Sequence, residues 1–232
     1  KVEWAKTIGG TSSDYIEAVA ECSDGGYIVG GYFYSSSIDL ESGVNLTREG
    51  GYNGMLIKYS SSGKLEWAKG IGGSDSVYIT SVSECEDGGH IVGGYFSGRS
   101  IDLENGISLT NKSLSTSYTD GLLLKYNSSG KLEWALGIGG TDRDYIESVR
   151  ECSDGGYIVG GYFYSSSIDL GNRVSLNNQG ADDGMVIKYN KRGEVEWAHG
   201  IGNNSSDAIN SVAETSDGCY IAGGYFLSDS ID

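Results

Sequence analysis

The chain has 232 residues, including 38 Gly, 17 Tyr, 4 Trp, 4 Cys and no Pro, and its formal net charge is −16. This acidic balance argues against a nucleic-acid or anionic-membrane partner, because both require a basic surface. The sequence has no periodic runs of helix-forming residues, so we expect a β-rich chain. It has no apolar run long enough to span a membrane, so we expect no membrane insertion. It has neither a signal peptide nor an initiator Met, so we expect that it was excised or matured from a longer protein.

One stretch of sequence recurs four times. It reads Asp-Gly-Gly-Tyr-Ile-Val-Gly-Gly-Tyr-Phe at 24–33 and returns at 87–96, 154–163 and, in more divergent form, 217–226. The flanking Trp4, Trp67, Trp134 and Trp197 are spaced by 63, 67 and 63 residues. A period of this length indicates a repeat protein. We therefore expect a single repeat domain over 1–232, with units at about 1–63, 64–130, 131–193 and a partial 194–232.

In chain order, each unit begins with a short strand that contains the Trp, such as 2–5. A loop and an inner strand follow, and in the first unit alternation places Ile16, Ala18, Ala20 and Cys22 on one face of that strand. Small side chains on this face suit a strand that packs close to a common axis. The Asp-Gly-Gly link then predicts a tight hairpin.

The return strand 27–33 carries paired glycines, which leave room for another backbone or a large aromatic side chain. A Ser-Ile-Asp-Leu signature and an accessory hairpin lead to a third strand at 55–59, and a Ser-Ser-Ser-Gly turn leads to the next Trp strand. Each unit is thus a four-stranded antiparallel meander. The predicted fold is all-β, a β-propeller or a segment of one, with 3.5 repeats of about 63–67 residues.

The repeat frame begins with a Trp strand and stops after the return strand of the fourth unit. A closing blade built from these parts would lack its third strand and would expose unpaired strand edges. We expect either adjacent segments of a parent chain or a second copy, in a homo-oligomer, to complete the half-blades.

Several spaced motifs resemble a known repeat. They are Gly-Gly-x-x-x-Asp-Tyr-Ile, Asp-Gly-Gly-Tyr-Ile-Val-Gly-Gly-Tyr, Asp-Gly-x-x-x-Lys-Tyr-x-x-x-Gly and x-x-Trp-Ala. Over essentially the whole chain, this pattern resembles the SBBP-type (bacterial β-propeller) repeats of large secreted or surface-attached bacterial proteins. The resemblance implies a propeller and an exported bacterial origin, and it implies no catalytic residues. Two departures are Val77, where the other units have Asp14, Asp144 and Asp207, and Asn53, where later units have Asp120 and Asp183.

Residues that recur in every unit are expected to serve the fold. The recurring Glu21 and Lys58 therefore predict salt bridges or a solvated face in preference to an axial cation site. The recurring Cys22, with Cys85 and Cys152, predicts small buried reduced thiols. His90 and His199 replace other residue types in single units, so neither a Ser-His-Asp triad nor a zinc site is expected. We predict no catalytic residue, no metal and no cofactor.

Four residues remain as candidates for ligand binding. Asp142 and Asp144 share a loop with Thr141 and form the best local group for a hard cation, although turn capping also explains them. Tyr34 and Tyr164 would stack on sugars if they are exposed, and the alternative is packing between blades.

The expected function is that of a non-enzymatic binding or spacer module at a bacterial cell surface or in the extracellular space. The variable stretches 41–53, 104–119 and 171–183 would contact a partner, because they differ between units while the framework does not. The alternatives are a carbohydrate-binding or enzyme-associated propeller with a shallow axial site, and a purely structural spacer. The partner, protein or glycan, is not identified by the sequence.

Overall fold

The computed structural model describes residues 2–113 and 115–230, so Leu114 of the stretch 104–119 lies outside the described residues. Strands dominate, and the helical segments among the described residues are two short 3-10 turns, η1 (Glu41–Gly43) and η2 (Glu104–Gly106). Within the same residues there is no helix with the length and apolarity that crossing a bilayer would need.

Three antiparallel sheets of four strands follow one another along the chain, and a two-stranded sheet comes last. The first contains β1 (Asp14–Glu21), β2 (Tyr27–Phe33), β5 (Asn53–Tyr59) and β6 (Leu65–Ile71); the second contains β7 (Val77–Glu84), β8 (His90–Ser97), β11 (Thr119–Tyr126) and β12 (Leu132–Ile138). The third contains β13 (Asp144–Glu151), β14 (Tyr157–Phe163), β17 (Asp183–Tyr189) and β18 (Val195–Ile201), and the last contains β19 (Asp207–Glu214) and β20 (Tyr220–Phe226). We call these strands, in the order within a sheet, the inner, return, third and Trp strands.

A small hairpin accompanies each four-stranded sheet, as the sequence predicts. The three pairs are β3 (Ser37–Asp39) with β4 (Asn45–Thr47), β9 (Ser100–Asp102) with β10 (Ser108–Thr110), and β15 (Ser167–Gly171) with β16 (Val174–Asn177). Each buries an Ile opposite a Leu, for example Ile38 opposite Leu46. These hairpins occupy much of the variable stretches, which are therefore more regular than loops.

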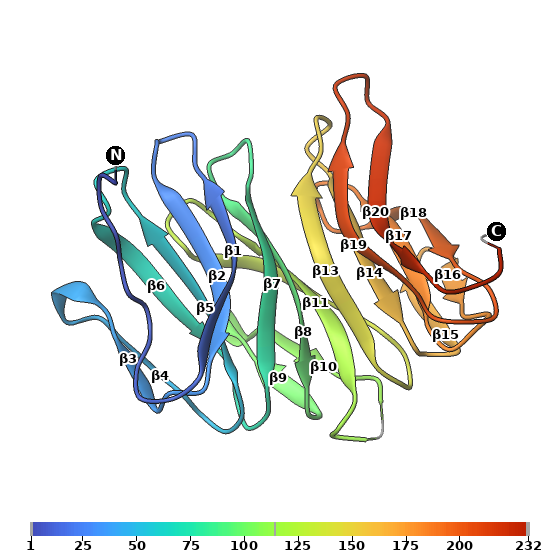
Figure 1. The fold of residues 1–232 in the computed structure, drawn as a ribbon, viewed down its shortest axis with the longest axis horizontal. Helices are drawn as coiled ribbons and strands as arrows, with labels where there is room; N and C mark the ends of the chain where they lie inside the picture. Colours follow the sequence, from blue (N-terminus) through green and yellow to red (C-terminus); the bar gives the residue numbers. More distant parts are fainter. Residues whose placement is uncertain (1, 114, 231–232) are drawn as a thin grey trace.

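The inner strands β1, β7, β13 and β19 lie side by side, and they follow one another across the molecule from the N-terminal to the C-terminal side (Figure 1). Consecutive sheets pack face to face and share apolar cores; Cys22 and Ile28 of the first sheet, for instance, join one cluster with Ile79 and Val82 of the second. This arrangement confirms the predicted all-β, propeller-like fold. The described residues form an open array in which the first and last sheets do not meet (Figure 1).

The paired glycines of the return strand make close packing possible, and each does so differently. A Cβ on Gly30 would lie 2.6 Å from Val82 Cγ1 and 2.9 Å from Ile79 Cγ2, both in the next sheet. A Cβ on Gly31 would overlap the carbonyl oxygen of Tyr15 within the same sheet. The predicted close approach is thus confirmed, and the side chains that enter at the first glycine are aliphatic.

A β-bulge corrects the predicted face of the inner strand. Pairing with the return strand skips one residue in every unit; in the first unit Ile16 pairs with Gly31 and Ala18 with Gly30, so Glu17 is extra. The bulge shifts the alternation by one residue. Ile16 therefore shares a face with Val19, toward the preceding side of the array, whereas Ala18, Ala20 and Cys22 face the following sheet.

The predicted strand at 2–5 is not formed, and no strand is assigned within residues 2–13. A strand requires a hydrogen-bonded neighbour, and for this segment no third strand is present among the described residues. Trp4 nevertheless keeps the place of its equivalents. Its ring contacts those of Tyr27 and Tyr59, at 5.5 and 6.3 Å between centroids, and its indole Nε1 donates to the carbonyl of Ser61 at 3.2 Å.

The recurring cysteines are buried free thiols, as predicted. Burial raises the pKa of Cys22 and Cys152 to about 11 and that of Cys85 to about 12. In the second unit His90 replaces the usual Tyr and is fully buried, with its Nε2 3.8 Å from Cys22 Sγ. Burial lowers the pKa of His90 to about 4, so the ring is neutral at pH 7.

Candidate functional site

Six tyrosines form a continuous row across three units. They alternate between inner and return strands in the order Tyr15, Tyr32, Tyr78, Tyr95, Tyr145 and Tyr162, and successive ring centroids are 4.8 to 5.0 Å apart. Aromatic pairs at such distances stabilise each other beyond the burial of their surface. The row stops at the fourth unit, where Ala208 replaces the inner-strand tyrosine. We call it the tyrosine row.

The strand register explains how the row is built. The two tyrosines of a unit are direct cross-strand partners, for example Tyr15 with Tyr32 and Tyr78 with Tyr95. In the first two units the return-strand ring also reaches the inner-strand ring of the next sheet, as Tyr32 reaches Tyr78 and Tyr95 reaches Tyr145. Within each unit the inner strand begins and the return strand ends at this row. The row therefore marks the end of the array opposite the Asp-Gly-Gly hairpin turns, which are at the top in Figure 1.

Two of the predicted candidates extend the tyrosine row to the surface. Tyr34, 43% exposed, packs on Tyr52 at 4.8 Å, and the guanidinium of Arg48 lies 4.3 Å from the Tyr34 ring centroid. A cation over an aromatic face at this distance is attracted by the ring quadrupole. Tyr52 in turn contacts Tyr78 of the row at 5.4 Å.

The third unit carries a similar group. Tyr164 is half-buried, 6.2 Å from Tyr162 of the row, and the Arg143 guanidinium lies 5.3 Å from the Tyr164 ring and 5.8 Å from the ring of Tyr118. Because Arg48 and Tyr52 belong to the predicted stretch 41–53 and Tyr118 to 104–119, these stretches return to the tyrosine row. The structure thus brings Tyr34 and Tyr164 to one end of the molecule, each with an arginine on its ring.

The bulge residues add carboxylates next to the tyrosine row. They are Glu17 in the first unit and Glu147 in the third, while Thr80 and Asn210 take the place in the others. Burial raises the pKa of Glu147, and the charge of Glu17 raises it further. Burial and the nearby Glu17 raise the pKa of Tyr32 to about 12, so its hydroxyl remains a hydrogen-bond donor at physiological pH. This end of the array therefore combines tyrosine rings and hydroxyls with negative charge.

The remaining candidates, Asp144 and Asp142, have local partners. The buried Asp144 carboxylate accepts from the backbone N–H of Gly140 at 2.8 Å and from the Ser165 hydroxyl at 2.7 Å, and burial raises its pKa to about 7. Asp14 and Asp207 make the same contacts in their units. The Asp142 carboxylate accepts from the backbone N–H of Arg143 at 2.8 Å. Among the described residues, no three His, Cys, Asp or Glu side chains are grouped so that they could hold a metal ion.

The recurring lysines and glutamates take part in contacts that repeat from unit to unit. Each third-strand lysine is buried and pairs with the Asp of the hairpin turn, as Lys188 Nζ does with Asp154 at 2.8 Å and with Glu196 of the Trp strand at 3.3 Å. The inner-strand glutamate accepts from a hairpin-turn N–H of the preceding unit, as Glu214 does from Ser153 at 2.6 Å. The predicted salt bridges of the lysines are confirmed.

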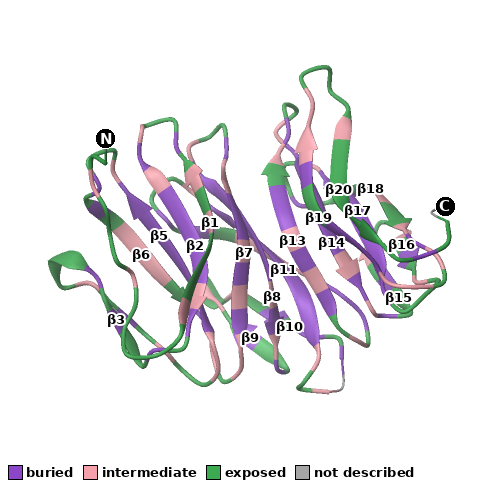
Figure 2. Ribbon diagram, in the orientation of Figure 1, coloured by how far each residue is buried: buried purple, intermediate pink, exposed green. Residues whose placement is uncertain are grey.

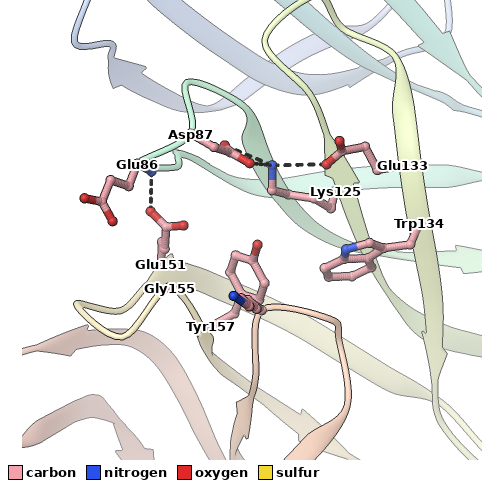
Figure 3. A pocket seen from close by; sticks show the side chains of 9 residues that line it. Glu86, Asp87, Lys125, Glu133, Trp134, Glu151, Gly155 and Tyr157 are labelled. Atoms are coloured by element: carbon pink, nitrogen blue, oxygen red, sulfur yellow. Dashed lines mark hydrogen bonds and ion pairs between the residues drawn. The ribbon is translucent and has the colours of Figure 1, made fainter.

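A cleft of about 390 Å³ opens between the second and third sheets at the hairpin-turn end (Figure 3). Trp134 and Tyr157 form its apolar wall, with their rings 5.7 Å apart. Several of its polar groups are already paired, because Lys125 Nζ bonds Asp87 at 2.9 Å and Glu133 at 3.4 Å, and Glu151 accepts from the N–H of Glu86 (Figure 3). The same Trp contact recurs where Trp67 meets His90 and Trp197 meets Tyr220, so this cleft belongs to the repeated packing between sheets.

Sequence reasoning named Tyr34 and Tyr164 but missed the tyrosine row, Arg48 and Arg143. The available signal was the recurrence of Tyr15, Tyr78 and Tyr145 before the inner-strand Ile, together with that of Tyr32 and its equivalents. Their contact depends on how neighbouring sheets pack, which no spacing within one unit reveals.

No protein-family model matches this chain. It is 26% identical over 214 residues to the regulatory protein FlaEY of Caulobacter vibrioides, with 90% of this chain and 22% of that protein covered. It is 25% identical over 197 residues to an uncharacterised WD repeat-containing protein of Acanthamoeba polyphaga mimivirus, with 73% and 14% covered. The chain therefore spans less than a quarter of the length of either relative.

Among solved structures, a crystal structure of a protein of unknown function from Bacteroides caccae is similar, with a TM-score of 0.48 and 12% identity over 95% of this chain and 60% of that one. The repeated four-stranded sheets fit a propeller-type repeat protein, and the weak similarity to a WD repeat-containing protein agrees with this.

Proposed function

We propose that the chain is a non-catalytic binding module of a bacterial extracellular or cell-surface protein, and that it contacts another protein through the tyrosine end. We define the tyrosine end as the tyrosine row with Tyr34, Tyr52, Arg48, Tyr118, Tyr164 and Arg143. The observation that carries the proposal is the convergence of exposed and half-buried tyrosines and two arginines from several units on one end of a rigid β framework.

Residue type supports a protein partner. Tyrosine and arginine are enriched in the energetically dominant positions of protein interfaces, because they contribute large contact areas and directed polar groups. The framework beneath them is rigid, since the rings pack on each other and on buried strands. Little conformational entropy would be lost on binding. The similarity to a protein described as regulatory agrees with a binding role.

The partner surface is expected to carry basic groups. The chain has a net charge of −16, and Glu17 and Glu147 lie next to the tyrosine row. Arginine and lysine side chains of a partner would meet both aromatic rings and carboxylates there. The attraction would raise the association rate and would weaken at high salt.

Carbohydrate binding is the alternative function, and Tyr34 is the residue that favours it, because its ring is partly exposed. The Arg48 guanidinium already covers one face of that ring, and a sugar would have to displace it or use the other face. The experiment below includes a glycan arm for this reason.

Site-specific photo-cross-linking tests the proposal. A photoreactive phenylalanine analogue replaces Tyr34 in one protein and Lys191, which lies near the hairpin-turn end, in the control; each is incubated with a surface extract of the source organism. We expect a discrete protein adduct at position 34, none at 191, and loss of the adduct in a second variant that also carries Tyr52→Ala. Equal adducts at both positions would contradict the proposal, and retention on a glycan array that requires Tyr34 and Tyr164 would favour the alternative.

A further inference from the structure

The joints between consecutive sheets repeat one set of apolar contacts. At each joint an Ile and a Val of an inner strand rest on the first glycine of the preceding return strand. Ile79 and Val82 rest on Gly30, and Ile146 and Val149 rest on Gly93. The third joint is formed in the same way by Ile209 and Val212 on Gly160. All six side chains are buried.

Polar contacts repeat at the same joints. The hydroxyl of Ser81 accepts from the backbone N–H of Val149 at 3.0 Å, and that of Ser148 accepts from Val212 at 3.2 Å. The inner-strand glutamate accepts from the hairpin turn of the preceding unit, as Glu84 does from the N–H of Ser23 at 2.6 Å. A joint is thus specified by aliphatic, hydroxyl and carboxylate groups in fixed positions.

Two faces of the array carry halves of this joint without a neighbour among the described residues. On the N-terminal face Ile16 and Val19 are 42% and 61% exposed, although their equivalents in later units are buried. On the C-terminal face Ile221 and Tyr225 are 58% and 48% exposed, and nothing lies within 4 Å of a Cβ placed on Gly223. Figure 2 shows that β20 is exposed over most of its length, in contrast to β2, β8 and β14.

We propose that these two faces bind each other between two copies of the chain, in a head-to-tail contact. Ile16 and Val19 of one copy rest on Gly223 of the other, as the three internal joints show for their equivalents. The Ser211 hydroxyl accepts from the Val19 N–H, and Glu21 accepts from the Ser216 N–H. Tyr225 packs on Tyr15 of the second copy, as Tyr32 packs on Tyr78 within one chain. These groups have the residue types of their internal equivalents with three exceptions: Ala18 replaces the serine of the first inner strand, Glu86 the serine of the second hairpin turn, and Ala208 the tyrosine of the fourth inner strand.

The shapes of the two faces agree with this contact. The segment 2–13 of the N-terminal face holds Trp4 against Tyr27 and Tyr59, where Trp strands of other units pack, and leaves the inner strand β1 open. The C-terminal face is a half-sheet that consists of an inner and a return strand alone. In the contact, the segment that carries Trp4 would therefore lie where the other three sheets place the Trp strand of the preceding unit.

Cys219 distinguishes the edge of β20, at which a third strand would pair, from the equivalent edges of the other return strands. In the first three units the equivalent residue is Gly26, Gly89 or Gly156, and a Cβ there would overlap the carbonyl oxygen of the third-strand tyrosine and the lysine Nζ. Cys219 has that Cβ. A strand of the repeat type would have to shift or end early beside β20.

The contact is heterologous, since it joins different surfaces of the two copies, and such contacts give rings or open chains. This property allows a decisive mixing experiment with two variants. Val19→Glu places a charge in the N-terminal half of the contact, and Gly223→Glu places one in the C-terminal half. Both side chains point into solvent within one copy, so each variant should fold, and far-UV circular dichroism with a thermal melt verifies this.

We measure solution mass by light scattering over a range of concentrations. The native chain is expected to exceed monomer mass as concentration rises, and each variant to associate more than about tenfold more weakly, because a buried charge lacks a partner. An equimolar mixture of the two variants retains one intact contact and should form dimers and nothing larger. A native chain that stays monomeric would overturn the proposal, as would a mixture that remains monomeric although the native chain associates. Lys191→Gln, away from both faces, changes the net charge by the same one unit; it serves as the charge-matched control and should associate like the native chain.

Discussion

Replacement of one glycine in the third joint tests how the sheets are held together. In Gly160→Ala the new Cβ would lie 2.7 Å from Val212 Cγ1 and 2.9 Å from Ile209 Cγ2, closer than real Cβ contacts come. Val212 and Ile209 are buried on the fourth unit and have little room to move. Overpacking of this kind costs about 1–3 kcal/mol. Gly160 is not in the left-handed region, so backbone conformation adds no separate penalty.

Gly223 provides the matched control, because it has the same place in the repeat and no atom within 4 Å of its Cβ position. Gly223→Ala should be neutral or slightly stabilising, by up to about 0.5 kcal/mol, since alanine restricts the unfolded chain. Gly93→Ala should fall between the two, because its nearest atoms, on Ile146 and Val149, are 3.0 and 3.3 Å away.

Equilibrium urea unfolding in dilute solution measures these differences. With a slope of about 2 kcal/mol per molar urea, a loss of about 2 kcal/mol lowers the midpoint by about 1 M. We expect the midpoints in the order Gly223→Ala, Gly93→Ala, Gly160→Ala from highest to lowest. Equal destabilisation by Gly160→Ala and Gly223→Ala would refute the packing of each inner strand on the preceding glycine.

Three further predictions concern charges and thiols. Asp154→Ala should destabilise by about 2 kcal/mol, because it leaves the buried Lys188 with one carboxylate partner fewer. Asp217→Ala should lower the urea midpoint less, because Asp217 has no lysine partner among the described residues and loses its contact with the Thr215 hydroxyl at an exposed turn. Burial lowers the pKa of His90 to about 4, whereas the unfolded chain keeps a pKa near 6.5. The unfolded state therefore binds more protons between these two pH values. The stability that depends on the neutral ring is complete above pH 6.5 and falls by at most about 3 kcal/mol as the pH is lowered to 4. His90→Tyr, which restores the residue of the first and third units, should flatten the pH dependence of the urea midpoint in that window, and an unchanged slope would contradict the assignment. Finally, Cys219 alone should react with a thiol reagent at pH 8 in the folded chain, because the other three cysteines are buried and their pKa values are raised. All four cysteines should react in denaturant. Rapid reaction of Cys22 in the folded chain would contradict its burial.

The strands themselves could be predicted from the sequence because each has a local signature. The return strand 27–33 has the predicted bounds, since the Asp-Gly-Gly turn begins it and the Ser-rich segment ends it. Gly25 at φ 77° confirms the tight turn expected from its glycines. The accessory hairpin that buries Ile38 and Leu46 was also predicted from alternation. These features depend on residues close together in the chain.

Features that depend on neighbouring strands could not be predicted from one unit. The bulge at Glu17 leaves no mark in the alternation of apolar residues, so the face shared by Ile16 and Val19 was assigned wrongly. The segment 2–5 has the sequence of a strand, but its strand character depends on a third strand that lies beside it in the other units. Tyr34 and Tyr164 were singled out, whereas the tyrosine row that connects them arises only when sheets pack.

Amide exchange at the joints tests most directly whether consecutive units meet through their inner strands. The Ser81 hydroxyl accepts from the Val149 N–H and the Ser148 hydroxyl from the Val212 N–H, each across a joint. A lost hydrogen bond costs about 1 kcal/mol, so Ser81→Ala should speed exchange at Val149 by about fivefold to tenfold and leave Val212 unchanged, and Ser148→Ala should do the reverse. If neither substitution affects the amide in the next unit, or if both affect the two amides alike, the sheets do not pack around adjacent inner strands.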